Sequence, residues 1–569
     1  MAPKTLYLSS LPTLSPLFLA THFVTSTRTS LTFYYSKPPS ILCKSVQPRT
    51  REQTPVSAPE PEGTGAAAPT RGEIFLERQK ALADSAKVLK EIKKKKKREK
   101  VGGSMKASRT VPSCYGCGAP LQISETDAPG YVDPQTYELK KKHHQLRKVL
   151  CGRCQLLSHG HMITAVGGHG GYSGGKQFVS AEELREKLSH LRHENALIVK
   201  LVDVVDFNGS FLARVRDLAG ANPIILVVTK VDLLPKGTDL NCVGDWVVEA
   251  TMKKKLNVTS VHLTSSKSLV GIAGVVSEIQ REKKGRDVYI LGSANVGKSA
   301  FINALLKMMS YKDPVAAAAQ KYKPIQSAVP GTTLGPIQID AFMGGGKVYD
   351  TPGVHLHHRQ AAVVHTDDLP ALAPQSRLRG RSFPNSQLTL DECTAGKIGS
   401  NGLNGFSIFW GGLVRIDVLK ALPQTCLTFY GPKALQIHLV PTTEADEFYQ
   451  REVGNRLTPP TGKELGDNWR GLETQRQLQI ICEDARRPAR DVAISGLGWI
   501  AVEPIGRSPE VCDTNFKEAD RELLLAVHVP KPVEIFVRPP MPVGKGGEEW
   551  YQYQELTEKE LEIRPKWNF

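Results

Sequence analysis

One short segment restricts the fold of this chain more than any other. Residues 292–299 read Gly-Ser-Ala-Asn-Val-Gly-Lys-Ser, which is the pattern GxxxxGKS. The apolar run at 288–291 has the composition of a buried strand, and residues 299–309 have that of a helix. Between a strand and a helix, this pattern is a loop whose backbone N–H groups surround nucleotide phosphates. We therefore expect an α/β domain with a parallel sheet covered on both faces.

Four further motifs accompany this loop in an unusual order. Thr-Lys-Val-Asp at 229–232 and Ser-Ser-Lys at 265–267 precede it, whereas Pro-Gly-Thr-Thr at 330–333 and Asp-Thr-Pro-Gly at 350–353 follow it. Together they are the five motifs of a GTPase domain, in which the phosphate loop ordinarily comes first. The rotated order is that of a circularly permuted GTPase. As a consequence, the two switch segments lead directly into the C-terminal part of the chain.

The loop and the two motifs after it predict how phosphates and magnesium are held. We expect Lys298 to reach the β- and γ-phosphates, Asp350 to hold the magnesium shell, and Gly353 to sense the γ-phosphate through its N–H group. The expected magnesium ligands are Ser299 and Thr333, with Thr332 as the alternative threonine. The predicted cofactors at this site are GTP or GDP and Mg²⁺.

The motif at 229–232 predicts the choice of base. The Asp232 carboxylate can accept two hydrogen bonds that guanine donates and adenine cannot, and the stem of Lys230 would pack along the base. Thr229 replaces the usual asparagine and weakens one supporting hydrogen bond worth about 1 kcal/mol, so the preference for guanine should survive. The predicted nucleotide-binding residues are Gly292, Asn295, Val296, Gly297, Lys298, Ser299, Thr229, Lys230, Asp232, Ser265, Ser266, Lys267, Thr332, Thr333, Asp350 and Gly353.

Hydrolysis is expected to be slow. Val354 occupies the position of the water-orienting glutamine of Ras-like enzymes, and a valine cannot orient water. Asn295 occupies the loop position that binds K⁺ in potassium-activated GTPases, although it could instead only stabilise its own loop. The predicted catalytic residues are Lys298, Asn295, Thr333, Asp350 and Gly353. The residues that follow are either switch residues or RNA contacts: His355, His357, His358 and Arg359.

Four cysteines predict a metal site. Two CxxC pairs lie 33 residues apart within a module at 110–165, and four thiolates suit a tetrahedral structural Zn²⁺ site. The predicted zinc ligands are Cys114, Cys117, Cys151 and Cys154. The module is also strongly basic, with Lys-Lys-Lys-His-His at 140–144 and Arg147, Lys148 and Arg153 nearby. This basic set is either a solvated face or, as we prefer, an RNA contact.

The N-terminal part of the chain has the composition of a targeting segment and a linker. Residues 1–51 contain no Asp or Glu and sixteen Ser or Thr, which is typical of a transit peptide and favours a chloroplast over a mitochondrion. Residues 52–109 are predicted to be a disordered basic linker. Within it, residues 71–100 carry twelve Lys or Arg against five Asp or Glu, as a solvated tether or an RNA-contacting arm.

The remaining chain divides into three parts. Residues 180–375 are predicted to form the GTPase domain, 376–405 a flexible insertion, and 406–569 a β-rich α+β region. No stretch has the length and composition of a membrane span. The formal net charge of +17 favours an anionic partner, either nucleic acid or a membrane surface.

The chain resembles the YqeH-type circularly permuted GTPases. The resemblance rests on the permutation, the cysteine pairs, Asp203-Val-Val-Asp206-Phe-Asn within 202–210, Pro-Gly-Thr-Thr-Leu at 330–334, Gly-Gly-Leu-Val-Arg at 411–415 and Gly-Leu-Gly-Trp at 496–499. It implies a protein that binds GTP, hydrolyses it slowly and assists assembly of the small ribosomal subunit in bacteria and organelles. It also implies ribosomal RNA as a partner of the C-terminal region. We expect the chain to be a monomer. Plastid stroma, and also the mitochondrion, are the expected locations.

Two other functions stay open at this point. The first is an RNA-binding scaffold in which GTP is only structural. The second, more remote, is an enzyme of nitric oxide synthesis, although the sequence carries no flavin or nicotinamide fingerprint and no convincing haem-thiolate context.

Overall fold

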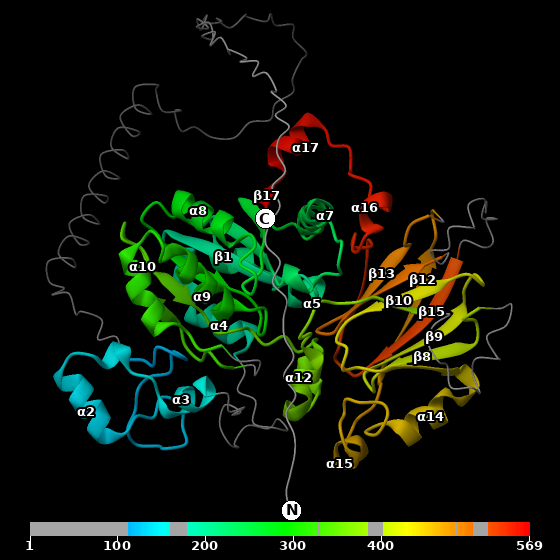
Figure 1. Ribbon diagram of the computed structural model, residues 1–569, viewed down its shortest axis with the longest axis horizontal. Coiled ribbons are helices and arrows are strands. Elements are labelled where there is room, and N and C mark those ends of the chain that lie inside the picture. The colour runs from blue at the N-terminus through cyan, green and yellow to red at the C-terminus, as the bar shows by residue number, and fades with distance from the viewer. Residues whose placement is uncertain (1–111, 160–178, 327–330, 385–401, 485, 505–521) are drawn as a thin grey trace, which may run out of the picture. The chain divides into compact units, whose positions relative to one another are not determined.

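The computed structural model describes residues 112–159, 179–326, 331–384, 402–484, 486–504 and 522–569 (Figure 1). The predicted transit peptide and linker, and Pro330 of the first switch motif, lie outside these described residues. Residues 107–569 belong to one compact unit, and all that follows concerns that unit.

Strand β1 (Ala196–Asp203) shows why the central region folds as a sheet covered on both faces. All eight of its residues are buried. Ile198 and Val202 belong to one apolar cluster, with residues of α4 (Ala181–Lys187) and α7 (Leu240–Lys253). Their neighbours Leu197 and Leu201 belong to a second cluster, with residues of α8 (Ile272–Lys283) and α9 (Lys298–Met309). Alternate residues of a strand point to opposite faces, so an apolar run of this kind must be covered twice.

The central sheet has seven strands, and its order displays the permutation. Strand β4, which leads into the phosphate loop, lies between β1 and β6, while β2 and β3 continue on the far side of β1. The strands pair in parallel except for β5, which is antiparallel to β6. In spatial order the strands are β17 (Lys566–Asn568), β3 (Ser260–Leu263), β2 (Ile224–Thr229), β1, β4 (Asp287–Leu291), β6 (Val348–Asp350) and β5 (Ile337–Ile339).

The C-terminal region contains two five-stranded antiparallel sheets with a common apolar core. The first sheet runs in the order β16 (Ile535–Arg538), β13 (Arg490–Ile494), β14 (Gly498–Glu503), β10 (Cys426–Tyr430) and β7 (Arg381–Phe383). The second runs in the order β11 (Ile437–Pro441), β8 (Phe406–Trp410), β9 (Val414–Lys420), β15 (Glu522–Val529) and β12 (Thr474–Ile481). We call this pair of sheets the C-terminal sandwich.

One face of the sandwich is shared with the GTPase domain. Along β14, Ile500 and Val502 belong to the core between the two sheets. Trp499 and Ala501, which point the other way, belong to the same apolar cluster as α4 and α7 of the GTPase domain. The first sheet is therefore buried on both faces, and the sandwich and the GTPase domain are joined by a continuous core.

Two elements differ from the predicted domain boundaries. Strand β7 lies inside the stretch predicted as a flexible insertion and pairs with β10 of the sandwich. Residues 385–401 of that stretch lie outside the described residues. Strand β17 lies inside the predicted C-terminal region, yet it pairs with β3 at the edge of the central sheet. Its Trp567 packs so closely on Gly244 of α7 that a Cβ atom there would lie 2.6 Å from the ring.

The cysteine module is small and rich in loops, and it contains α2 (Pro134–Lys142) and α3 (Gly152–Ser158). The other helices are α5 (Phe207–Ser210), α6 (Val215–Ala219), α10 (Pro314–Ala319), α11 (Gln360–Val363), α12 (Leu369–Leu372), α14 (Ala445–Glu452), α15 (Lys463–Asp467), α16 (Gly547–Trp550) and α17 (Glu558–Ile563). Single turns of 3-10 helix lie at Leu146–Lys148, Ser189–Arg192, Val231–Leu233, Gln320–Tyr322, Thr366–Asp368 and Thr442–Glu444. Among the described helices, none has the length and apolarity required to cross a membrane.

Candidate nucleotide site and cysteine centre

The phosphate loop has the strand-to-helix geometry that its sequence predicts. Strand β4 ends at Leu291, and α9 begins at Lys298. Gly297 and Asn295 adopt left-handed backbone conformations, with φ values of 88° and 61°, which turn the chain sharply between the two elements. The first N–H groups of a helix lack carbonyl partners within it, so this turn presents donors suited to phosphate oxygens.

Lys298 is buried inside the loop. Its Nζ donates to the carbonyl oxygens of Gly292 at 3.2 Å and Ser293 at 2.9 Å. Burial lowers the pKa of Lys298 to about 8; the charge of Asp350 opposes this shift, and the charge of Arg359 adds to it. A bound polyphosphate would place further negative charge beside this ammonium group.

Asp350 and Ser299 together provide a donor set for a hard cation. The Ser299 hydroxyl donates to Oδ2 of Asp350 at 3.0 Å. The other oxygen, Oδ1, is buried and has no hydrogen-bond partner in the described part of the chain. Burial raises the pKa of Asp350 to about 6, although the Lys298 charge and the hydroxyls of Ser299 and Thr333 oppose the rise. An orphaned carboxylate oxygen beside a serine hydroxyl fits Mg²⁺, which prefers oxygen ligands.

The segment after Asp350 packs tightly against the loop. A Cβ atom on Gly353 would lie 2.9 Å from both Cα of Ala294 and Nζ of Lys298, so only glycine fits. The next residue, Val354, is fully buried, and its carbonyl accepts a hydrogen bond from the Ala294 N–H at 2.8 Å. A valine turned into the core cannot orient water.

The base-recognition motifs meet beside the loop. The Ser265 hydroxyl donates to Asp232 Oδ1 at 2.6 Å, which joins the two motifs. Thr229 Oγ1 lies 2.7 Å from the carbonyl oxygen of Val296, so this threonine fastens the motif to the phosphate loop. Lys230 Nζ contacts Asp203 Oδ2 at 2.5 Å and the Asn295 carbonyl at 2.9 Å. Ser266 is half-buried and Lys267 is exposed.

A cavity of about 350 Å³ lies over the loop. Many of the predicted site residues line it: Lys230, Asn295, Gly297, Lys298, Ser299, Thr332, Thr333 and Gly353. The other predicted residues lie outside this lining: Thr229, Asp232, Ser265, Ser266, Lys267, Gly292, Val296 and Asp350. The cavity also takes in residues to which sequence reasoning gave no role at the nucleotide: Asp203, Asp206, Arg359, Gly496 and Leu497. The two aspartates belong to the 202–210 segment, and Gly496 and Leu497 to the 496–499 segment, that carried the family resemblance, which was the available signal for these four residues.

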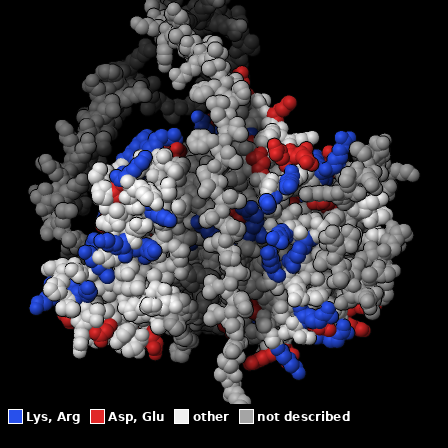
Figure 2. Space-filling view, viewed as in Figure 1, with Lys and Arg blue, Asp and Glu red and all other residues white. Residues whose placement is uncertain are grey.

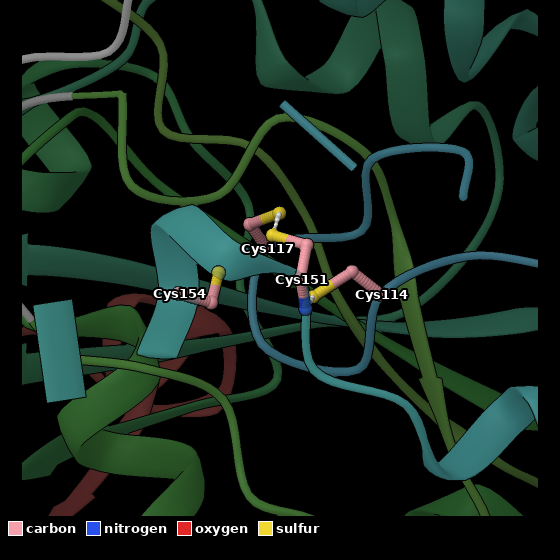
Figure 3. Close-up of side chains that lie close together, drawn as sticks. All are labelled: Cys114, Cys117, Cys151 and Cys154. Carbon is pink, nitrogen blue, oxygen red and sulfur yellow. Dashed lines mark hydrogen bonds between the residues drawn. The ribbon is translucent and has the colours of Figure 1, made fainter. Parts of the chain in front are cut away.

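The four predicted zinc ligands converge (Figure 3). All four side chains are buried, and their sulfur atoms lie within 4.8 Å of one another. The Cys117 and Cys151 sulfur atoms are 3.9 Å apart. Thiolates about 2.3 Å from a tetrahedral zinc lie about 3.8 Å apart, so the cluster fits a Cys₄ zinc site.

The cysteine module contacts the first switch segment. The Cys117 carbonyl accepts hydrogen bonds from the N–H groups of Leu334 at 2.7 Å and Gly335 at 3.2 Å. The Ile325 N–H donates to the Gly116 carbonyl at 3.2 Å. Arg153 was predicted as an RNA contact, but its Nη2 donates to the Gly331 carbonyl at 3.1 Å. In contrast, α2, which carries the lysines at 140–142, has no buried residue.

Two protein families match this chain. Residues 287–373 match the family described as 50S ribosome-binding GTPase, and residues 424–512 match the YqeH-like C-terminal family. The second match covers parts of both sheets of the sandwich.

Several curated relatives match over most of the chain. "NO-associated protein 1, chloroplastic/mitochondrial" of Arabidopsis thaliana is 67% identical over 551 residues, which cover 96% of this chain and 97% of the relative. "Putative nitric oxide synthase" of Oryza sativa subsp. japonica is 69% identical, with 90% of this chain and 92% of the relative covered. "Uncharacterized protein YqeH" of Bacillus subtilis is 31% identical, with 75% of this chain and 98% of the relative covered.

Proposed function

Because the chain belongs to the YqeH-like family of circularly permuted GTPases, we propose that it binds GTP, hydrolyses it slowly and thereby times a step in the assembly of the small subunit of an organellar ribosome. One observation carries the proposal. The cavity over the phosphate loop is lined by Gly496 and Leu497 of the C-terminal sandwich, and its switch threonines adjoin Gly331, which bonds to the cysteine module. A nucleotide bound there would therefore affect both the sandwich and the cysteine module.

Nucleotide and magnesium binding would use residues of the phosphate loop, the two switch segments and the base-recognition motifs. Lys298 would neutralise the β- and γ-phosphates, and Ser299, Asp350 and Thr333 would hold Mg²⁺. When bound, that ion would neutralise charge on the phosphates during transfer to water. Asp232, held by Ser265, would select guanine, so Asp232→Asn should weaken GTP binding and improve that of xanthine nucleotides.

Hydrolysis would depend on a cation, because Val354 is buried and cannot orient water. Asn295 lines the cavity and is proposed to hold K⁺ beside the phosphates. GTP turnover should be faster in potassium chloride than in sodium chloride at equal ionic strength. Asn295→Ala should remove that difference while retaining most of the nucleotide binding, and equal turnover of the unmodified protein in both salts would contradict the potassium site.

The partner is proposed to be ribosomal RNA in a small-subunit precursor. The net charge of +17 supports an anionic partner, and Figure 2 shows Lys and Arg side chains in several groups on the face in view, interspersed with Asp and Glu. The family that matches residues 287–373 is described as binding the 50S ribosome instead, so both subunits belong in the test. The name of the Arabidopsis relative supports a chloroplast location, in the stroma, with the mitochondrion as a second location.

The decisive experiment is co-sedimentation with organellar small-subunit and large-subunit particles. We expect tighter binding to small-subunit precursors with a non-hydrolysable GTP analogue than with GDP, and steep weakening as salt rises. Lys298→Ala should remove the difference between nucleotides. Equal sedimentation in all nucleotide states would favour the scaffold function, and binding to large-subunit particles alone would refute the small-subunit assignment. Arginine-to-citrulline turnover by the pure protein would favour the nitric oxide alternative.

A further inference from the structure

Arg359 lies six residues after Gly353 and lines the nucleotide cavity. Its side chain is only 10% exposed. Its Nε donates to Asp206 Oδ2 at 2.9 Å, and its Nη1 donates to the carbonyl oxygen of Ala294 at 2.7 Å. Ala294 belongs to the phosphate loop, so the guanidinium group lies against the loop that would surround the phosphates.

Several buried charges surround Arg359. Arg359 and Lys298 both line the cavity, so two cations lie at this site together with the buried carboxylates of Asp206 and Asp350. Asp206 is buried as well, and burial raises its pKa against the opposing effects of Arg359 and of a hydrogen bond from the Gly496 N–H. A terminal phosphate would provide an anion for which the guanidinium group offers a planar, bidentate donor.

We propose that Arg359 binds the terminal phosphate of GTP and supplies, from within this chain, the positive charge that stabilises the transition state of hydrolysis. This inference rests on the proposed GTPase function and names the residue that would compensate for the apolar Val354. Arginine residues in this role are worth about 10³- to 10⁵-fold in turnover. As the guanidinium group turned toward phosphate, its ion pair with Asp206 would open.

Opening of the ion pair between Arg359 and Asp206 would change contacts with the C-terminal sandwich. Asp206 bonds to the Gly496 N–H, and the neighbouring Ser495 carbonyl accepts a hydrogen bond from the Gln360 N–H at 2.9 Å. A Cβ atom on Gly496 would lie 2.9 Å from that same nitrogen, so the turn and the arginine segment are in direct contact. Arg359 would therefore pair either with a phosphate or with Asp206, which is hydrogen-bonded to the sandwich.

The alternative is an ion pair that only stabilises the fold, and two variants separate the possibilities because they should act in opposite directions. Arg359→Ala removes the phosphate-binding cation. Asp206→Asn removes only its competitor and retains an oxygen that can accept the Gly496 N–H. A structural pair would make both variants lose activity together with stability.

The experiment measures single-turnover GTP hydrolysis, the affinity for GDP and the affinity for GDP with aluminium fluoride. For Arg359→Ala we expect hydrolysis to fall on the order of 10³-fold, aluminium fluoride to lose its effect, and GDP affinity to change less than about threefold. For Asp206→Asn we expect hydrolysis to be retained or raised. Arg214→Ala, which breaks an exposed ion pair with Asp217 of α6, is the matched control.

Similar losses in both variants, or unchanged hydrolysis in Arg359→Ala, would overturn the role of Arg359 while leaving the GTPase function in place. If the unmodified protein fails to bind GTP, the proposed function itself is wrong, and this inference falls with it. The two failures are therefore distinguishable.

Discussion

The nucleotide cavity has two structured neighbours that are attached in different ways. The cysteine module reaches the first switch segment through backbone hydrogen bonds to Cys117 and Gly116, and Ile325 and Leu334 beside that segment pack against its small core around the four thiols. The C-terminal sandwich instead shares an extended apolar core with the GTPase domain, and Asp206 and Arg359 lie beside that joint. We call the module a brace, because we infer that it holds the first switch segment in place only when its metal is bound. The sandwich, in contrast, is an integral part of the GTPase domain.

The largest expected effect is loss of the metal from the brace. We expect about one zinc per chain by elemental analysis, and Cys151→Ser should unfold the module, because structural zinc contributes about 10–16 kcal/mol in zinc-finger peptides. Hydrogen exchange should then rise at 331–335 but stay low in strands β1 to β4. Cys242→Ala, a buried thiol outside the cluster, should retain zinc. If the module stays fully protected from hydrogen exchange without zinc, its attachment does not depend on metal and the contrast with the sandwich is wrong.

The joint with the sandwich should behave as one core. Trp499 is fully buried and stacks on Tyr430 at 4.9 Å between ring centroids. Trp499→Ala should lower the free energy of unfolding by about 3–5 kcal/mol, and the GTPase domain and sandwich should still unfold in urea in a single transition. Leu419→Ala, at an exposed site on the same sandwich, is the control. Two separate transitions in the unmodified protein would show that the sandwich is an independent domain.

A glycine substitution can loosen the brace without touching a cysteine. Gly118 has a φ of 74°, and a Cβ atom there would lie 2.2 Å from the Gly335 carbonyl oxygen. Gly118→Ala should retain zinc and weaken magnesium-dependent GTP binding about tenfold, equivalent to about 1.4 kcal/mol. Gly285→Ala has a similar backbone conformation, with a φ of 80°, but open space around it. If the two variants behave alike in titrations, the contact with the switch segment has no effect on binding.

The smallest effect is a response to acid at the centre of the cavity. Burial raises the pKa of Asp350 to about 6, so the folded state holds this proton more tightly than the unfolded chain does. Ionising the buried carboxylate therefore costs stability as pH rises from about 4 to 6, and protonation restores it. Magnesium needs the ionised form, so its affinity should fall by up to tenfold per unit below pH 6. If magnesium affinity depends on pH in the same way in Gly118→Ala and Trp499→Ala, the effect arises at Asp350. If either variant shifts this pH dependence, the effect does not arise at Asp350 alone.

Sequence reasoning worked best where function depends on neighbouring residues. The phosphate loop, the permuted strand order and the four-cysteine cluster could all be predicted, because each depends on spacing over a few positions or on paired motifs. The contact of Arg359 with Asp206 could not, since it joins residues 153 positions apart and neither belongs to a motif of known role. Thr229 was expected to weaken the site, yet its short hydroxyl reaches the Val296 carbonyl. Strand β17 was missed because three residues carry too little periodicity to reveal their partner.

Strand β17 has a consequence for how this protein is made on a ribosome. It pairs with β3, and both Tyr551 and Arg564 bond to Asp245 of α7, so the edge of the nucleotide-binding sheet is completed by residues translated about 300 positions after β3. Strands β1 to β3 are synthesised hundreds of residues earlier, so the outer edge of β3 stays unpaired until β17 has been synthesised. A nascent chain stalled before residue 566 would thus expose an unpaired parallel strand, so the nucleotide-binding sheet is complete only after β17 has been synthesised.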